Sequence, residues 1–346
     1  MSCSGILHKK LLHDDTTAEA VNNAKIICGQ PNGIANFSKP THQWALNLYD
    51  QMLANTWFPQ EVSMQEDKRE YDNLTPDEKR MYDLVLAQLI YMDSLQTDNL
   101  ADNINPYITD KIINCCLVRQ AFEESLHSRS YAVMAEDISE NTDTVYELWR
   151  EDAELNKKNK YIAHVYQELA GEVTPEKIIL AMVANQCLEG IYFITGFAAF
   201  YALGHKMKNS AGMISFIHRD EKTHLILFQN IFRETRRQYP ELFTPELLEK
   251  AKQMIRDAVE LEVAWGQYVT QNNILGMTQP VIADYVRSLG NERLKALGLE
   301  PLFETDGIGA FLKKLEDRYG QHNETRSNFF ESKPRNYSKG TLDLDF

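Results

Sequence analysis

The stretch Glu123-Glu124-Ser125-Leu126-His127 places a glutamate three residues before a histidine, and the same spacing returns in Asp220-Glu221-Lys222-Thr223-His224. Both stretches lie in long segments whose apolar residues recur every three or four positions, the spacing of an amphipathic helix. Residues three apart share one face of a helix, so each carboxylate and its imidazole can bind one metal ion together. A single pair is common by chance on an exposed helix, and the second pair makes the pattern informative.

A further acid precedes each pair at nearly the same distance, Asp93 before Glu124 and Glu189 before Glu221. This is the pattern of carboxylate-bridged dinuclear metal sites in four-helix bundles, where two helices give one acid each and two give a Glu-x-x-His. Two neighbouring cations need several carboxylates to screen their repulsion, while imidazoles add nitrogen ligands. The mixture favours iron or manganese over zinc.

The surroundings of the two lone acids are strongly apolar. Glu189 lies within residues 181–200, which are apolar on nearly every face of a helix, and Asp93 follows the apolar residues 84–92. A carboxylate buried there must be paired or bind a metal. Neither segment offers an obvious basic partner, so metal binding is the better explanation.

The rest of the chain indicates an all-α protein. Its 346 residues allow one large or two ordinary domains, and Gly (16) and Pro (11) are sparse. Thr-Pro pairs followed by acids, at residues 75, 174 and 244, are typical helix starts. We predict helices near residues 42–55, 76–104, 110–137, 143–170, 175–206, 211–238, 245–272 and 280–297.

Charge and cysteine content exclude several classes of protein. With 36 Lys and Arg against 50 Asp and Glu, the net charge of −14 disfavours nucleic acid as a partner. The five cysteines are odd in number and lack a C-x-x-C pair, which suggests neither a disulfide framework nor a thiolate zinc site. The N-terminus lacks a secretory apolar core, and the longest apolar stretch, residues 191–203, is too short to span a membrane. We expect a cytoplasmic protein with no membrane segment.

Tyr131 lies four residues after His127 and seven after Glu124, on the same helical stripe, so its phenol should point toward the metals. The alternative is a core tyrosine, since the chain has 16. Apolar residues one or two turns from the ligands would form a dry shell around the metals and Tyr131 and protect a reactive intermediate. The residues of this predicted shell are Phe193, Phe197 and Ile217.

From about residue 55 onward, the chain resembles the small, radical-generating subunit of class I ribonucleotide reductase. The motifs that carry the resemblance are Asp93-Ser94-Leu95-Gln96, residues 124–131, Glu189-Gly190-Ile191-Tyr192-Phe193 and residues 219–224. The resemblance implies that Tyr131 carries the radical and that Glu124 and Glu221 bridge the two metals. The implied ligands of the first metal are Asp93, Glu124 and His127, and those of the second are Glu189, Glu221 and His224.

The resemblance also implies a path for radical transfer to a large catalytic subunit. Trp57, in Trp57-Phe58-Pro59, and Asp220 match the residues at which this path leaves the metal site, and Tyr337 matches a relay tyrosine in a flexible tail. Only nine residues follow Tyr337, fewer than in some relatives. The end of the tail alternates acids with apolar residues, which suits a groove with apolar pockets and a basic rim, whereas the alternative is a functionless end. The tail residues expected to bind the large subunit are Leu342, Leu344 and Phe346.

The implied fold is an all-α, ferritin-like helical bundle with a four-helix dinuclear-metal core and extra helices. We expect an irregular N-terminal arm (residues 1–35), the helical domain (36–315) and a flexible C-terminal tail (316–346). The implied protein is the small subunit of ribonucleoside-diphosphate reductase, which activates O2 to generate and store a tyrosyl radical that starts deoxyribonucleotide formation in the large subunit. It would be a homodimer with two Fe ions per chain, dimanganese being the alternative.

Two other functions use similar ligands. A dinuclear-iron oxidase or N-oxygenase would need an open pocket at the metals and no docking tail. A ferritin-like iron-binding protein would form a cage and bind many ions per chain. Two neighbouring residues are left outside the ligand set: we expect His218 to lie beside the ligands or at the surface, and Cys187 to lie in the core.

Overall fold

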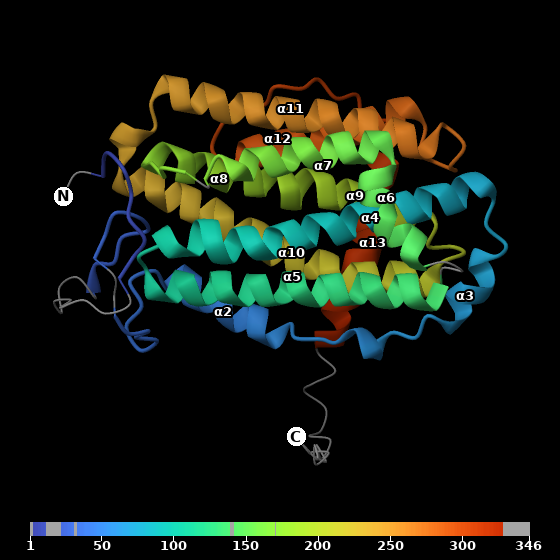
Figure 1. Cartoon of the computed structure of the whole chain (residues 1–346), viewed down its shortest axis with the longest axis horizontal. Helices are drawn as coiled ribbons and strands as arrows, with labels where there is room; N and C mark the ends of the chain where they lie inside the picture. The colour runs from blue at the N-terminus through green and yellow to red at the C-terminus, as the bar shows by residue number, and fades with distance from the viewer. Residues whose placement is uncertain (1–2, 12–21, 31–32, 139–141, 170, 328–346) are drawn as a thin grey trace, which may run out of the picture.

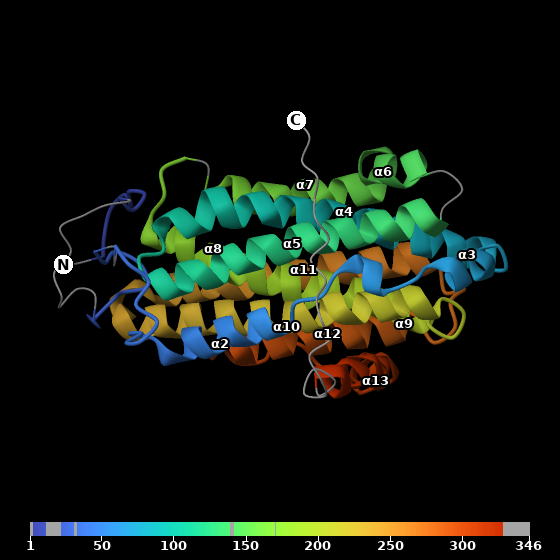
Figure 2. The ribbon, with the colours of Figure 1, turned by 90° about the horizontal axis from the view of Figure 1, so that it is seen from below.

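The computed structural model describes residues 3–11, 22–30, 33–138, 142–169 and 171–327, and this part of the chain contains helices and no strand. The long helices lie side by side along the longest axis of the molecule (Figure 1), and a view from below shows α13 on the outside of the bundle (Figure 2). The α-helices are α2 (Gln43–Ala54), α3 (Gln65–Tyr71), α4 (Pro76–Asp98), α5 (Lys111–Ile138), α6 (Thr142–Glu151), α7 (Ala153–Gln167), α8 (Pro175–Cys187), α9 (Phe193–Ala202), α10 (Lys208–Gln238), α11 (Pro245–Thr270), α12 (Gln279–Ala296) and α13 (Ala310–Ser327). Two π-helical segments, η2 (Asn99–Ile104) and η4 (Leu188–Tyr192), and three 3-10 turns, η1 (Pro59–Glu61), η3 (Asn105–Tyr107) and η5 (Pro240–Leu242), complete the elements.

The three predicted Thr-Pro helix starts are confirmed. In each, proline occupies the first turn, where its missing N–H is not needed, and the threonine side chain satisfies an N–H that the helix leaves unpaired. The threonine hydroxyl accepts a hydrogen bond from the backbone N–H three residues later, in Thr75 from Glu78, in Thr174 from Lys177 and in Thr244 from Leu247.

The centre of the bundle is the continuous helical segment formed by α8, η4 and α9. Over Pro175–Ala202 it is long and apolar enough to cross a membrane, and 94% of its most apolar window is buried inside the protein. Residues 191–203 cover only the C-terminal part of this segment, which begins at Pro175 and ends at Ala202. The apolar helix is therefore longer than expected, and its burial marks it as a core helix. Helices α4, α10 and α11 pack around this segment, as expected of a core helix that is apolar on every face.

The structure divides one predicted helix and adds two. The segment predicted as one helix over 143–170 breaks at Asp152, whose side chain accepts hydrogen bonds from the N–H groups of Glu154 and Leu155 and so begins α7. Helix α3 and helix α13 were not predicted. The tail expected from residue 316 begins inside α13, which continues to Ser327.

The N-terminal arm is joined to itself by a disulfide bond. Cys3 and Cys28 are paired, with their Cα atoms 5.4 Å apart, while the other three cysteines are free. This corrects the expectation of no disulfide. Cys3 is buried beside Cys28, whose backbone has a positive φ of 59°.

Candidate metal centre

The structure brings the six predicted ligand residues together in the interior of the bundle, where each side chain has an exposed fraction of 0%. Their oxygen and nitrogen atoms form two overlapping groups, and within each group the atoms lie within 4.8 Å of one another. The first group is Asp93 of α4, Glu124 and His127 of α5 and Glu221 of α10. The second group is Glu124, Glu189 of η4, Glu221 and His224 of α10. Since Glu124 and Glu221 belong to both groups, their positions suit bridging carboxylates.

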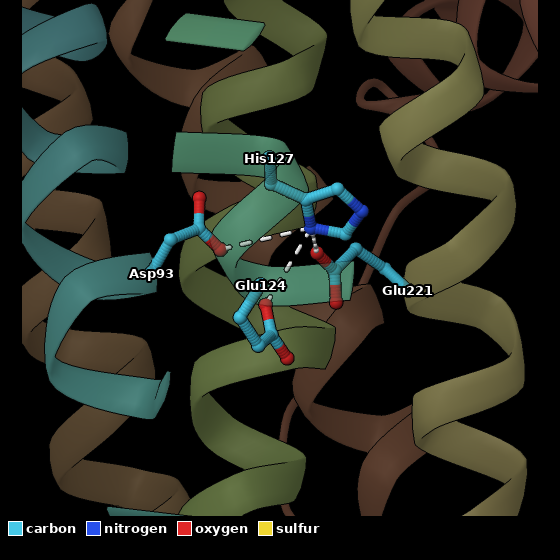
Figure 3. A group of neighbouring side chains, drawn as sticks. All are labelled: Asp93, Glu124, His127 and Glu221. Carbon is cyan, nitrogen blue, oxygen red and sulfur yellow. Dashed lines mark ion pairs between the residues drawn. The ribbon is translucent and has the colours of Figure 1, made fainter. Parts of the chain in front are cut away.

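Figure 3 shows the first group, with His127 Nδ1 facing three carboxylates. This nitrogen lies 3.1 Å from Glu221 Oε1, 3.5 Å from Glu124 Oε2 and 3.8 Å from Asp93 Oδ1. In the second group, His224 Nδ1 lies 2.9 Å from Glu221 Oε2 and 3.3 Å from Glu124 Oε1. Both imidazoles therefore direct Nδ1 toward the ligand carboxylates of the cluster.

Glu189 reaches the cluster from a π-helical segment. Such a segment holds an extra residue in its turn, and these insertions are frequent at functional sites. The next residue, Gly190, leaves room for the side chain of Arg293, which would overlap a Cβ at that position. The Oε1 atom of Glu189 accepts hydrogen bonds from three buried side-chain amides, Gln96 at 2.7 Å, Gln120 at 3.0 Å and Asn185 at 3.0 Å.

Many polar atoms that face the centre have no hydrogen-bond partner. Buried carboxylate oxygens and imidazole nitrogens without partners are costly in a protein core unless a ligand completes them. A pair of divalent cations would satisfy this donor set of four carboxylates and two imidazoles, so the residues fit a dinuclear metal site. The unpartnered atoms are both oxygens of Asp93, Oε2 of Glu124, Nδ1 of His127, Oε2 of Glu189 and Oε1 of Glu221.

Burial and crowding of like charges shift the pKa values of these groups. Burial raises the pKa of Asp93, and burial together with the charges of Glu189 and Glu221 raises that of Glu124. Burial and the Glu189 charge raise the pKa of Glu221 to about 8. Burial alone lowers the pKa of His127 and His224, but the surrounding carboxylates outweigh it and hold both pKa values well above the usual one. Protons thus occupy the metal-free cluster.

Tyr131 lies on α5, the helix that also carries Glu124 and His127, in a fully enclosed position. Its exposed fraction is 0%, and its phenol oxygen has no hydrogen-bond partner. Burial, followed by the charge of the neighbouring Asp93, raises the pKa of the phenol well above its usual value. The predicted shell residues Phe193, Phe197 and Ile217 are also fully buried, and the rings of Phe193 and Phe197 stack at 6.1 Å.

Asp220 connects the cluster to Trp57, which lies in the segment between α2 and η1. The indole Nε1 of Trp57 donates a 2.7 Å hydrogen bond to Asp220 Oδ2, and the same oxygen lies 3.3 Å from His127 Nε2. The Trp57 ring also stacks on Phe216 at 5.1 Å. The two residues named from the resemblance are therefore in contact with each other and with a ligand.

The remaining predictions have different outcomes. His218 is buried and belongs to neither metal group. Its Nδ1 lies 2.9 Å from Tyr201 Oη. The core position of Cys187 is confirmed. Tyr337, Leu342, Leu344 and Phe346 lie outside the described residues.

Sequence reasoning missed the groups that hold the ligands. These are the amides of Gln96, Gln120 and Asn185, and Glu123, whose Oε2 lies 2.9 Å from His224 Nε2. A signal was present, because each of the four lies one to four residues from a ligand on a helix. The sequence does not say, however, toward which neighbouring helix a polar side chain extends.

A buried four-helix core with two carboxylate-histidine groups that share two glutamates defines a dinuclear-metal protein of the carboxylate-bridged class. Comparison with known proteins identifies it further. The family described as "Ribonucleotide reductase, small chain" matches residues 34–308, and the chain belongs to this family. The fold is accordingly the ferritin-like helical fold of these small subunits, and the two alternative functions are not favoured.

Relatives and solved structures agree with this assignment. The ribonucleoside-diphosphate reductase subunit beta of Treponema pallidum is 37% identical over 100% of this chain and 99% of its own length. The subunit beta of Halalkalibacterium halodurans is 31% identical over 98% of both chains. The ribonucleotide reductase R2 subunit from Clostridium botulinum is 36% identical with a TM-score of 0.86, covering 90% of this chain and 99% of that one. The dimanganese(II)-NrdF of Streptococcus sanguinis shares the fold, with a TM-score of 0.69 and 20% identity over 83% of this chain and 99% of that one.

Proposed function

We propose that this small subunit forms and stores a radical on Tyr131 for use by the large subunit. The observation that carries the proposal is the position of Tyr131, fully buried beside Asp93 at the edge of a cluster built for two metal ions. The six ligands are Asp93, Glu124, His127, Glu189, Glu221 and His224. When bound, the metal ions supply the reduction of O2 and the one-electron oxidising power.

Tyr131 loses one electron and its phenol proton. Asp93 is the carboxylate next to the phenol, so the oxygen that it does not use to hold the metal would accept that proton. The apolar residues Phe193, Phe197 and Ile217 exclude water, which would otherwise quench the radical.

Radical transfer toward the large subunit uses the contact of Trp57 with Asp220. The 2.7 Å hydrogen bond gives the indole proton an acceptor when Trp57 is oxidised, so charge does not accumulate in the core. Tyr337 then continues the path in the C-terminal tail, where Leu342, Leu344 and Phe346 bind the large subunit.

We assign iron as the metal, two ions per chain, because the motif around Tyr131 resembles the iron-tyrosyl group of the family; dimanganese is the alternative. The subunit acts as a homodimer in the cytoplasm. Mass measurement in solution by light scattering tests the dimer, and a monomeric mass would contradict it.

Electron paramagnetic resonance tests the proposal on protein loaded anaerobically with Fe(II) and then exposed to O2. We expect about two irons per chain and a tyrosyl signal that is absent from Tyr131→Phe, while the variant still binds both metals. Two irons without a radical would contradict the Fe-dependent proposal and direct the experiment to Mn(II). A radical that persists in Tyr131→Phe would refute the role of Tyr131, and many irons per chain would indicate storage.

A further inference from the structure

Glu123 is a buried carboxylate outside the six-ligand set. Its exposed fraction is 0%, and its Oε2 lies 2.9 Å from the Nε2 of His224 on a different helix. The Nδ1 of the same imidazole faces Glu124, Glu189 and Glu221 in the cluster. Because Nε2 is engaged by Glu123, the rotation of the ring is fixed and Nδ1 is the nitrogen left for the centre.

Glu123 is itself held by Arg119, one helical turn earlier on α5. Arg119 Nε donates a 2.9 Å hydrogen bond to Glu123 Oε1. The Nη2 group of Arg119 donates to the carbonyl oxygen of Met52 and to Thr56 Oγ1, each at 3.1 Å. Both oxygens of Glu123 are thus occupied, and the carboxylate cannot turn away from His224 without breaking the bond to Arg119.

The same construction occurs on the other side of the cluster. Asp220 precedes Glu221 on α10 and reaches His127 on α5, while Glu123 precedes Glu124 on α5 and reaches His224 on α10. The two contacts cross between the helices. They differ in the outer partner, which is the indole of Trp57 for Asp220 and the guanidinium of Arg119 for Glu123.

We propose that Glu123 is a positioning residue for the second metal ion, and that Arg119 holds it in place. It fixes His224 with Nδ1 toward the centre, as Asp220 does for His127. A guanidinium, unlike an indole, is not readily oxidised. The Glu123 side of the cluster therefore orients a ligand but provides no path for radical transfer. This inference rests on the proposed metal site.

The test is a Mn(II) titration of the full-length protein under anaerobic conditions, followed by calorimetry. Removing a carboxylate that orients a ligating histidine typically weakens metal affinity 10- to 100-fold. We expect Glu123→Ala to weaken one of the two Mn(II) sites by about this factor and to leave the other close to wild type. Glu123→Gln keeps an oxygen that can accept from Nε2 and should recover most of the affinity. The matched control is Glu136→Ala, which removes an exposed carboxylate of the same helix.

Mössbauer spectroscopy of the ⁵⁷Fe(II)-loaded variants gives a second signature. In Glu123→Ala, one of the two iron sites should change its quadrupole splitting, whereas a merely structural defect would alter both sites or lower the helix content of the metal-free protein. Equal weakening of both sites, or wild-type affinity at both, would overturn the inference. Wild-type protein that binds no pair of ions would refute the proposed metal site itself, so the two failures are distinguishable.

Discussion

Loading the metal centre should release at least two protons, one from each ligand histidine. Both ring nitrogens of each ligand histidine face carboxylates: His127 lies between Asp220 and Glu221, and His224 between Glu123 and Glu221. A neutral imidazole has only one N–H. The surrounding carboxylates hold the pKa of both imidazoles well above the usual value, so each ring carries two protons in the metal-free protein. A metal ion at Nδ1 must displace one proton from each ring.

Carboxyl groups with raised pKa values, Glu124 and Glu221, add to this number. The pKa of Glu221 is raised to about 8 by burial and by the Glu189 charge, so most of the molecules carry a proton there at pH 7. Metal ions and protons compete for the same atoms, and affinity must therefore fall as pH falls. Release of at least two protons corresponds to a change of at least about 3 kcal/mol in the free energy of loading per pH unit, at about 1.4 kcal/mol for each proton.

Calorimetric titration with Mn(II) at pH 7, in two buffers of different ionisation enthalpy, measures the number directly. Tyr131→Phe is the matched control, because it leaves all six ligands in place and should release the same number. A release of fewer than two protons would refute the reasoning, since it would mean that the histidines are neutral in the metal-free protein.

Three further predictions concern residues around the centre. Trp57→Phe removes the indole N–H that bonds to Asp220; the paramagnetic signal of Tyr131 should persist while turnover with the large subunit falls to background, and unchanged turnover would exclude Trp57 from the path. Lys158→Met leaves the buried carboxylate of Glu262 unpaired and should lower the free energy of unfolding in urea by about 3–5 kcal/mol, whereas Lys158→Met with Glu262→Leu should recover most of it; an equal loss in both would argue against the ion pair as the cause. Burial alone raises the pKa of Glu316, but His218 and Lys313 lower it to about 2, so its contribution to stability is present near neutral pH and is lost as pH falls toward 2. Glu316→Gln should therefore show a weaker loss of stability between pH 5 and pH 3, and parallel unfolding profiles would contradict this assignment.

The ligand set could be predicted from the sequence because two spacings repeat. The i, i+3 pairs at Glu124 and Glu221 depend only on helix geometry, and the apolar surroundings of Glu189 indicate burial. The contact of Glu123 with His224 could not be predicted, since it joins α5 to α10 and depends on how the two helices pack.

Local structure explains the other features that could not be predicted from the sequence. The π-helical segment at Glu189 leaves no mark in a sequence that is apolar on every face. The break at Asp152 depends on a side chain that competes for backbone N–H groups, a choice that helical periodicity does not reveal. Helix α13 was missed because its sequence is rich in charge, although Leu312 and Glu316 are buried.

The buried helix over Pro175–Ala202 also has a consequence for biosynthesis. Two of the helices that cover it, α10 and α11, are encoded after it, and α11 ends at Thr270. A ribosome that adds about 5–20 residues per second needs roughly 3–14 seconds to complete that stretch. During this interval the nascent chain carries a segment as apolar as a membrane span without two of its covering helices. We therefore expect the yield of active subunit to depend on the pace of translation through residues 203–270.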